Sequence, residues 1–511
     1  MTEPTPLTSA EPAIADHGDD LPEQVAVRHD KRRRLLDDGV EVYPVRVPRT
    51  HSLESVRAEF GHLEPDTSTG TAVSITGRVI FLRTAGKLCF ARLREGGGAE
   101  LQVMVSLAVA GDEGLDSWKR MVDIGDIVAV QGEVISSRTG ELSVMAESWI
   151  FASKALHPLP VAHKELSDET RSRQRYVDLI VRPEAQTMAR MRPRVVQSLR
   201  STFAEWDFIE VETPMLQTQH GGATARPFVT HSNAFDIDLY LRIAPELFLK
   251  RCVVGGLERV FEINRNFRNE GADRSHSPEF AMLEWYEAWA DYTDMARETR
   301  ELIQRAALAA HGSLTFEVAD GSVVDLSGEW GTAYVYPSVS AAVGETITPD
   351  TPVARLRELC ELVGIHAEPT WVAGKYVEEL LEHHVVGTLV GPTFVYDYPE
   401  DTSPLVRGHR ELPGVVEKWD LYLNGVEQAT GYSELIDPVV QRERLEAQGA
   451  LKSRGDVEAM AVDDDFLRAL EYGMPPTGGV GMGLDRLLMT LTGLGIRDTI
   501  LFPLVKPRER G

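Results

Sequence analysis

The chain has 511 residues, 43% hydrophobic and 26% charged, which is ordinary for a globular enzyme of two or three domains. The net charge of −26 counts against non-specific nucleic-acid binding but leaves room for a local basic patch. Three widely spaced cysteines argue against disulfides or a cysteine-ligated zinc site, and no apolar stretch is long enough to span a membrane. We therefore expect a cytoplasmic protein.

The N-terminal segment divides into two predicted parts. Residues 1–20 are acidic and rich in proline, which favours a disordered lead-in over a signal or transit peptide. A helical arm is predicted over residues 21–70, because Asp20 and Glu23 have the spacing of a capping box. The basic run KRRR (31–34) in this arm is either a nucleic-acid patch or, as we favour, a solvated helix face.

Residues 71–155 predict a small β-barrel. Short runs rich in β-branched residues alternate there with glycine-containing turns, which indicates about five antiparallel strands. The stretch LDSWKRMVDI (115–124) is the expected helix after the third strand. This order is typical of an oligonucleotide-binding (OB) fold, whose sheet face binds unpaired bases. A purely structural β-domain is the alternative.

A proline-marked linker is predicted over residues 156–184, followed by a catalytic domain over 185–511. Helices and strands mix in this domain without regular βαβ alternation, which favours an α+β fold with an antiparallel sheet flanked by helices. There is no P-loop of the form GxxxxGK[ST].

The stretch FRNEGADRSHSPEF (267–280) is strongly polar, yet it lies between the apolar run LERVFEI and the helix-like run FAMLEWYEAW. A hairpin here can bind a polyanion, because the planar guanidinium of Arg268 makes two hydrogen bonds to a phosphate. Phe280 offers an aromatic face to a purine base. A structural salt-bridge loop is nearly as plausible from this segment alone.

The run GGVGMGLDRLLM (478–489) places glycines before an expected helix with Arg486 in its first turn. Glycines let the backbone approach a ligand closely, and a helix N-terminus favours anions. Helix packing would explain the glycines alone. Together with the Arg268 hairpin, however, the run indicates an ATP site.

Two carboxylates, Asp420 and Glu427, lie seven residues apart on either side of the dipeptide NG (424–425). An odd spacing places residues on opposite faces of one strand, so a shared site needs a bulge or a turn. The NG dipeptide is a strong hairpin signal. Hard oxygen ligands of this kind hold Mg²⁺ near phosphates.

Three motifs in this order resemble those of the class II aminoacyl-tRNA synthetases: FIEVETPML (208–216) with Pro214, FRNEGADRSHSPEF, and GMGLDR (481–486). Within the class, GGATARPF, YLRIAPELFLKR, VFEINRNFRNEG and GYSEL are similar to the lysyl-tRNA synthetases. The resemblance covers the chain from about residue 70 onward. It implies an OB-fold anticodon domain and a catalytic domain with a six- to seven-stranded, mostly antiparallel sheet, in a homodimer formed through the first motif.

The resemblance also implies the reaction. L-lysine would be activated with ATP and Mg²⁺ to lysyl-adenylate and pyrophosphate, and then transferred to the 3′ end of tRNA(Lys). The implied catalytic residues are Arg268 and Arg486. The implied ATP contacts are Arg268, Glu270, His276, Phe280 and Arg486. The implied metal ligands are Asp420 and Glu427, although the family's first ligand is usually Glu.

An acidic pocket suits lysine, because this substrate carries two ammonium groups. The implied lysine-binding residues are Gly222, Glu246, Glu284, Tyr286, Thr430, Tyr432 and Glu434. The chain reads ATGYSEL (429–435) where the family has GNGFSEL, so Thr430 replaces an Asn that touches the substrate carboxylate. A threonine can still donate one hydrogen bond.

In the barrel, the resemblance implies that a U-rich anticodon is bound. The implied anticodon-binding residues are Arg78, Arg83, Phe90, Gln102 and Glu141. Phe90 would stack on a base, which single-stranded RNA recognition usually requires. Arg78 and Arg83 read equally well as exposed strand charges.

Two other functions would leave different signals in the sequence. A paralogue that lost catalysis would be expected to lose Arg268, Arg486 or the metal ligands, and all are present. An enzyme that transfers lysine to a protein or a lipid would lack the barrel or carry membrane spans. Transfer to tRNA is therefore favoured, with ATP, L-lysine and tRNA(Lys) as partners and no membrane.

Overall fold

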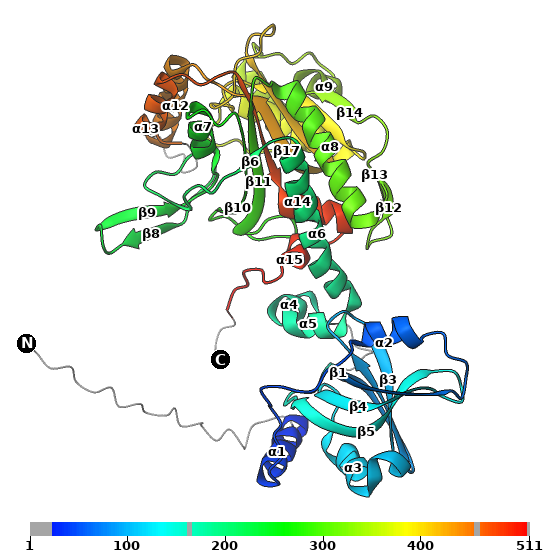
Figure 1. Cartoon of the computed structure of the whole chain (residues 1–511). Coiled ribbons are helices and arrows are strands. Elements are labelled where there is room, and N and C mark those ends of the chain that lie inside the picture. The colour runs from blue at the N-terminus through cyan, green and yellow to red at the C-terminus, as the bar shows by residue number, and fades with distance from the viewer. Residues whose placement is uncertain (1–22, 161–165, 454–459, 508–511) are drawn as a thin grey trace, which may run out of the picture. The chain divides into compact units, whose positions relative to one another are not determined.

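The computed structural model describes residues 23–160, 166–453 and 460–507, which form two compact units (Figure 1). The first unit runs up to Leu166 and includes Val177–Pro183. The second consists of Ser167–Tyr176 and the chain from Glu184 onward. The predicted lead-in over residues 1–20 and the capping residue Asp20 lie outside the described residues. The other predicted domain boundaries stay predictions.

The first unit contains a closed five-stranded barrel, as the sequence predicted. The strand order is β1-β2-β3-β5-β4, and helix α3 follows β3. Along β3, buried residues such as Leu101 and Val103 point into the barrel, and the residues between them are more exposed. The elements are α1 (Glu23–Asp37), α2 (Leu53–Phe60), β1 (Ser68–Ala85), β2 (Leu88–Arg94), β3 (Glu100–Ser106), α3 (Leu107–Met121), β4 (Ile127–Ser136) and β5 (Leu142–Ser153).

The basic run of α1 is partly structural. Lys31 Nζ donates to Asp123 Oδ1 at 2.7 Å, while Arg33 and Arg34 pair with Asp30 on their own helix. Asp123 also accepts from the fully buried Lys154. The run therefore contributes to the packing of α1 within this unit.

The second unit is built on an eight-stranded sheet, with strand order β14-β15-β16-β17-β18-β11-β10-β6. All neighbours are antiparallel except β14–β15 and β10–β6. The strands are β6 (Ile209–Glu210), β10 (Arg259–Phe267), β11 (Glu279–Ala288), β14 (Gly331–Tyr334), β15 (Thr393–Pro399), β16 (Val415–Leu423), β17 (Val426–Ser433) and β18 (Thr477–Gly483). The expected number of six or seven is too low, because the edge strands β6 and β14 are too short to leave a sequence signal.

Two central strands differ from the sequence interpretation. The helix-like run FAMLEWYEAW lies largely in β11, where nearly every residue is buried, so the alternation typical of a half-exposed strand is lost. The glycine run 478–483 is itself part of strand β18. A Cβ on Gly431 or Gly478 would collide with Trp419 or Met295, so glycine permits close packing here.

Helices cover both faces of this sheet. Helices α6 (Pro183–Glu205), α8 (Tyr292–His311) and α14 (Leu484–Thr492) pack on one face through a core that includes Phe203, Trp285 and Trp419 (Figure 1). Helix α7 (Glu246–Val254) packs with α13 (Asp464–Glu471) against β10 and β11 in a separate cluster around Tyr286. No helix of the described segments is long and apolar enough to cross a membrane.

The second unit also contains a small sheet and several further helices. A three-stranded sheet, ordered β7-β9-β8, lies between the first motif and α7. The elements are α4 (Asp168–Arg173), β7 (Leu216–Gln217), β8 (Val229–Ser232), β9 (Ile237–Leu241), β12 (Thr315–Glu317), β13 (Val323–Asp325), α9 (Val335–Val343), α10 (Val353–Leu362), α11 (Ala373–His384), α12 (Pro438–Ser453) and α15 (Ile496–Thr499). Helix α5 (Arg175–Val181) belongs to the first unit from Val177 onward.

Candidate active site

Two cavities in the second unit share a wall. One has a volume of about 220 Å³ and the other about 250 Å³. Both are lined by the same four residues: Arg268, Met282, Thr430 and Gly481. The first is acidic, and the second is lined by all five predicted ATP contacts. The common residues therefore lie where a substrate in one cavity would meet a substrate in the other.

Arg268 follows directly after β10, at the start of the predicted hairpin loop. Its backbone N–H donates to Pro278 O at 2.9 Å, which closes the loop between β10 and β11. The side-chain Nε is buried and has no hydrogen-bond partner among the described residues. Burial lowers the pKa of Arg268, whereas the nearby carboxylates of Glu270 and Glu427 favour its charged form. An unpaired buried donor of this kind is available to an anionic ligand.

The second cavity brings together the predicted ATP contacts Glu270, His276, Phe280 and Arg486. Arg268 Cζ lies 5.2 Å from the centroid of the Phe280 ring. Arg486 Nη1 donates to Glu427 O at 3.0 Å and lies 3.3 Å from Glu427 Oε1. Helix α14 thus holds one cationic side chain at a cavity that is otherwise lined mainly by the β10–β11 hairpin and by strands β17 and β18.

Asp485 fixes the start of α14 against the sheet, a contribution that the sequence interpretation missed. Its Oδ2 accepts from the backbone N–H of Ala281 at 2.7 Å, and its Oδ1 accepts from Arg192 at 2.5 Å. These contacts join α14, β11 and α6. Asp485 therefore holds Arg486 in position next to the hairpin.

Asp420 and Glu427 lie on the predicted hairpin, formed by β16 and β17. Asn424 and Gly425 form its turn with φ angles of 52° and 72°, as the NG dipeptide indicates. A bulge lies between Leu421 and Tyr422, so the odd spacing is absorbed. The charge of Glu427 contributes to a raised pKa of Asp420.

These two carboxylates fit a hard cation. Asp420 Oδ1 is buried and has no hydrogen-bond partner in the described segments, while Oδ2 lies 3.4 Å from Lys418 Nζ. Burial is the main cause of the raised pKa of Asp420, and the Lys418 ammonium opposes the shift. No group of three or more metal-ligating side chains occurs among the described residues. A cation here would therefore share its coordination with phosphate oxygens and water.

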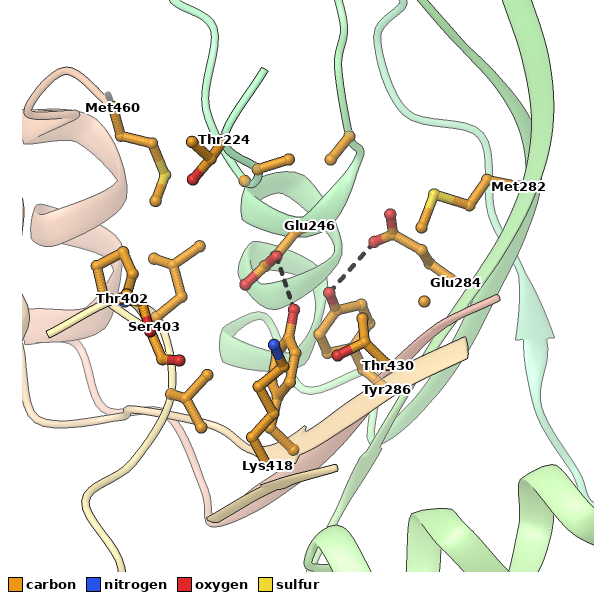
Figure 2. Close-up of a pocket in the computed structure, with 18 of the residues that line it drawn as sticks. Thr224, Glu246, Met282, Glu284, Tyr286, Thr402, Ser403, Lys418, Thr430 and Met460 are labelled. Carbon is orange, nitrogen blue, oxygen red and sulfur yellow. Dashed lines mark hydrogen bonds between the residues drawn. The ribbon is translucent and has the colours of Figure 1, made fainter. Parts of the chain in front are cut away.

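The first cavity contains most of the predicted lysine-binding residues, which reach it from α7, β11 and β17 (Figure 2). Tyr286 OH donates to Glu284 Oε2 at 3.3 Å. Burial raises the pKa of Glu284 well above its usual value, and the charge of Glu246 adds to the shift. The predicted residues that line it are Gly222, Glu246, Glu284, Tyr286, Thr430 and Tyr432.

Gly222 has a backbone conformation that only glycine adopts readily, with φ of 85°. A Cβ at this position would lie 3.1 Å from Glu246 Cβ and 3.3 Å from Ala244 Cβ. The glycine therefore lets the loop before β8 approach the first turn of α7 and close this side of the cavity.

Glu434 departs from the predicted arrangement, because it does not line the cavity. It is fully buried and forms an ion pair with Lys250 of α7. Lys250 Nζ also donates to Glu246 Oε1 at 2.7 Å. The sequence interpretation missed Lys250. Its spacing of four from Glu246 was the available signal, since such residues are neighbours on a helix.

The two departures from the family pattern have visible contacts. Tyr432 OH donates to Glu246 Oε2 at 3.2 Å, so the additional hydroxyl orients a pocket carboxylate. Thr430 lines both cavities, and its hydroxyl lies 3.4 Å from Trp419 O. The Thr430 side chain also interacts with Asp420, where a hydrogen bond to the carboxylate favours its ionised form and opposes the raised pKa of Asp420.

The barrel places part of the predicted anticodon set on one sheet face. Phe90 and Arg83 are directly opposite each other on β2 and β1, with Arg83 Cζ 5.0 Å from the ring centroid. Gln102 Nε2 donates to Ser143 Oγ at 2.9 Å. Arg78 donates to Gly125 O at 2.7 Å, and Glu141 lies 3.9 Å from Arg57 at the β4–β5 turn. Arg78 and Gln102 thus have partners within the barrel, whereas Phe90 and Arg83 present a joint surface.

The two units match two known families. Residues 167–506 match the family described as tRNA synthetases class II (D, K and N). Residues 73–151 match the OB-fold nucleic acid binding domain. The first match covers more than half of the chain, and the chain belongs to the class II tRNA synthetases.

Similar proteins indicate which kind of class II synthetase this chain resembles in sequence and length. A lysine–tRNA ligase of Kineococcus radiotolerans is 64% identical over 96% of this chain and 98% of its own length. One of Mycolicibacterium gilvum is 62% identical with the same coverage. A lysylphosphatidylglycerol biosynthesis bifunctional protein LysX of Nocardia farcinica is 49% identical over 97% of this chain but only 44% of its own length. Within class II, the chain belongs to the lysine–tRNA ligase family.

Proposed function

We propose that the chain activates L-lysine with ATP at the two joined cavities and transfers it to tRNA(Lys). The observation that carries this proposal is the shared wall. The acidic cavity containing Glu246 and Glu284 meets the cavity containing Phe280 and Arg486 at a single guanidinium, that of Arg268. A lysine carboxylate and an ATP α-phosphate would thus meet at one cation.

The charge of each residue determines which substrate group it binds. Arg268 holds the substrate carboxylate and the α-phosphate together, and neutralises charge as the carboxylate oxygen attacks the phosphorus in line. Glu246 takes the α-ammonium group, and Glu284 with Tyr286 takes the ε-ammonium group. Phe280 and Arg486 hold the adenine ring, and Glu270 and His276 contact ATP. No general acid is required, because pyrophosphate leaves as an anion.

We assign Mg²⁺ to Asp420 and Glu427. The bound cation would neutralise charge on the phosphates of ATP. The chemistry of the two carboxylates and the unpaired Oδ1 of Asp420 support this assignment. Lys418, 3.4 Å from Asp420 Oδ2, keeps the site from accumulating uncompensated negative charge in the free protein.

We assign anticodon binding to the barrel and the homodimer contact to the segment around Pro214. Several apolar side chains near that segment are exposed, which supports a protein interface. They are Ile209, Met215, Leu216, Val229 and Phe235. Light scattering coupled to gel filtration should give twice the chain mass, and a monomer at micromolar concentration would contradict the dimer. A cytoplasmic location follows from the proposed reaction.

The reaction is tested by pyrophosphate exchange into ATP with each of the twenty amino acids, without tRNA. Exchange with lysine alone is expected. Exchange with none, while ATP still binds, would favour a regulatory protein that has lost catalysis. Exchange with a different amino acid would show that the acidic cavity is misassigned.

A further inference from the structure

Lys250 is a fully buried cation that has no assigned role in the proposed reaction. It lies on α7, one turn after Glu246, and its Nζ contacts Glu246, Glu434 and the carbonyl oxygen of Leu405 at 3.4 Å. Lysine is almost never fully buried unless its charge is paired. The cation therefore belongs to the carboxylate cluster beside the acidic cavity.

We propose that Lys250 is a positioning and specificity residue. Its fixed positive charge reduces the negative charge of the carboxylate cluster to the amount that the two ammonium groups of lysine neutralise. The inference rests on the proposed lysine activation and names a residue through which it is achieved. Lys250 does not touch the cavity itself, since it is not among the lining residues. It acts through Glu246 and Glu434.

A charge count carries the argument. When lysine is bound and all three carboxylates are ionised, Glu246, Glu284 and Glu434 bring three negative charges, and Lys250 removes one, so two remain. Lysine brings two ammonium groups to this cluster, while its carboxylate is assigned to Arg268. The other cation on the cavity wall, Lys418, is engaged with Asp420. A substrate with a single ammonium group would leave one buried carboxylate unpaired, which is costly.

The packing holds these charges in place. Gly479 of β18 lies directly beneath Glu434 and Tyr286, and a Cβ there would collide with both side chains. Glu434 Oε1 is buried without a hydrogen-bond partner in the described structure. The carboxylate thus has little freedom to turn toward water, and its ionisation depends on the charges around it.

The groups that face Glu434 come from three elements: Lys250 and Glu246 on α7, Tyr286 on β11, and Tyr432 on β17. Burial and Glu246 raise the pKa of Glu434 to about 8, and Lys250 opposes this rise. In the free protein Glu434 therefore holds a proton below about pH 8, and this proton is displaced when an ammonium group binds. Loss of the Lys250 charge must shift this ionisation to higher pH.

Lys250→Met tests the proposal in the full-length protein by pyrophosphate exchange across pH 6 to 9.5. We expect the lysine KM to rise by about tenfold or more near neutral pH, since a charged hydrogen-bonding partner is lost. The ATP KM should change far less. The pH at which the lysine kcat/KM levels off should move upward. An unchanged lysine KM and pH profile would overturn the proposal.

Lys154→Met is the matched control. Lys154 is also fully buried between two carboxylates, Asp123 and Asp126, but it lies in the barrel unit. Its replacement carries the general cost of losing a buried cation. If it shifts the lysine pH profile as much as Lys250→Met does, the effect is not specific to the cluster and the proposal fails.

The double variant Lys250→Met, Glu434→Gln separates charge from packing, and removing both charges also favours folding. Its cluster keeps two negative charges, Glu246 and Glu284. The double variant should therefore have a higher lysine kcat/KM than Glu434→Gln alone. If the losses of lysine kcat/KM in the two single variants instead multiply in the double variant, Lys250 has a packing role only and the proposal fails. Absence of lysine exchange in the unaltered protein would instead refute the proposed function.

Discussion

Glu284 is the cavity carboxylate whose role is easiest to isolate. It is buried on β11, and within the described segments it accepts a hydrogen bond from Tyr286 OH at 3.3 Å. Glu284→Gln should lower the lysine kcat/KM by about 10- to 100-fold, because a hydrogen bond to a charged group contributes roughly 1.5–3 kcal/mol. The ATP KM should be nearly unchanged. Pyrophosphate exchange at varied lysine and ATP concentrations measures both.

Glu298→Gln is a suitable control for this prediction. Glu298 lies on α8, on the other face of the sheet, and burial raises its pKa to about 9. It accepts from Trp285 Nε1 at 3.2 Å. If Glu298→Gln impairs lysine use as strongly as Glu284→Gln, the loss reflects stability rather than contact with the substrate.

The raised pKa of Glu434 predicts how lysine affinity depends on pH. Below about pH 8 the free protein holds a proton that the complex with lysine releases, so lysine affinity should rise with pH and level off above about 8. Calorimetric titration in buffers of different ionisation enthalpy measures the released proton. Lysine binding without proton release at pH 7 would contradict the assignment of Glu434.

The same group affects stability in the opposite direction. Between its usual pKa of 4.5 and its value of about 8 in the fold, Glu434 carries a proton only in the folded state. Its contribution to the free energy of unfolding therefore falls as pH rises through this window. Saturating lysine should offset the loss, and thermal unfolding with and without lysine at pH 6 and 8 would show the difference.

The β16–β17 hairpin places the two proposed metal ligands. Gly425→Ala places a side chain at φ of 72°, which should destabilise the turn by about 1 kcal/mol and displace Glu427 two residues later. The Mg²⁺ concentration that gives half-maximal exchange should rise, while the lysine KM changes little. Gly86→Ala, in the β1–β2 turn at φ of 57°, is the control and should leave both values unchanged.

How far the sequence predicts an element depends on whether its signal is local. The β10–β11 loop and the β16–β17 turn are correctly predicted, because polar residues and the NG dipeptide mark them within a few positions. Strand β11 is missed as a strand, since burial on both faces removes its alternation. The glycines of β18 likewise read as a flexible run, because only neighbouring side chains reveal why they are needed.

The site follows the same distinction. Arg268, Phe280 and Arg486 are recognisable from their motifs, and they line one cavity as expected. The pairing of Lys250 with Glu434 was not predictable, since the two residues are 184 positions apart in the sequence and meet only in the folded chain. A fold is needed to show which charges neutralise one another.

At the scale of the whole molecule, the barrel should affect tRNA use without affecting adenylate formation. Phe90→Ala removes the ring that faces Arg83, and stacking on a base contributes roughly 1–3 kcal/mol. Aminoacylation of tRNA(Lys) should fall by about 5- to 150-fold in kcat/KM. Pyrophosphate exchange by the same preparation is the internal control, and an equal loss in both reactions would refute a separate anticodon role.

The wall shared by the two cavities has a practical consequence for inhibitor chemistry. One compound that carries a lysine-like diamine at one end and a purine at the other could occupy both spaces at once, passing Arg268 midway. Joining two fragments in this way avoids part of the entropy cost of binding each separately. Selectivity over enzymes for other amino acids would come from the diamine end, where the acidic residues lie.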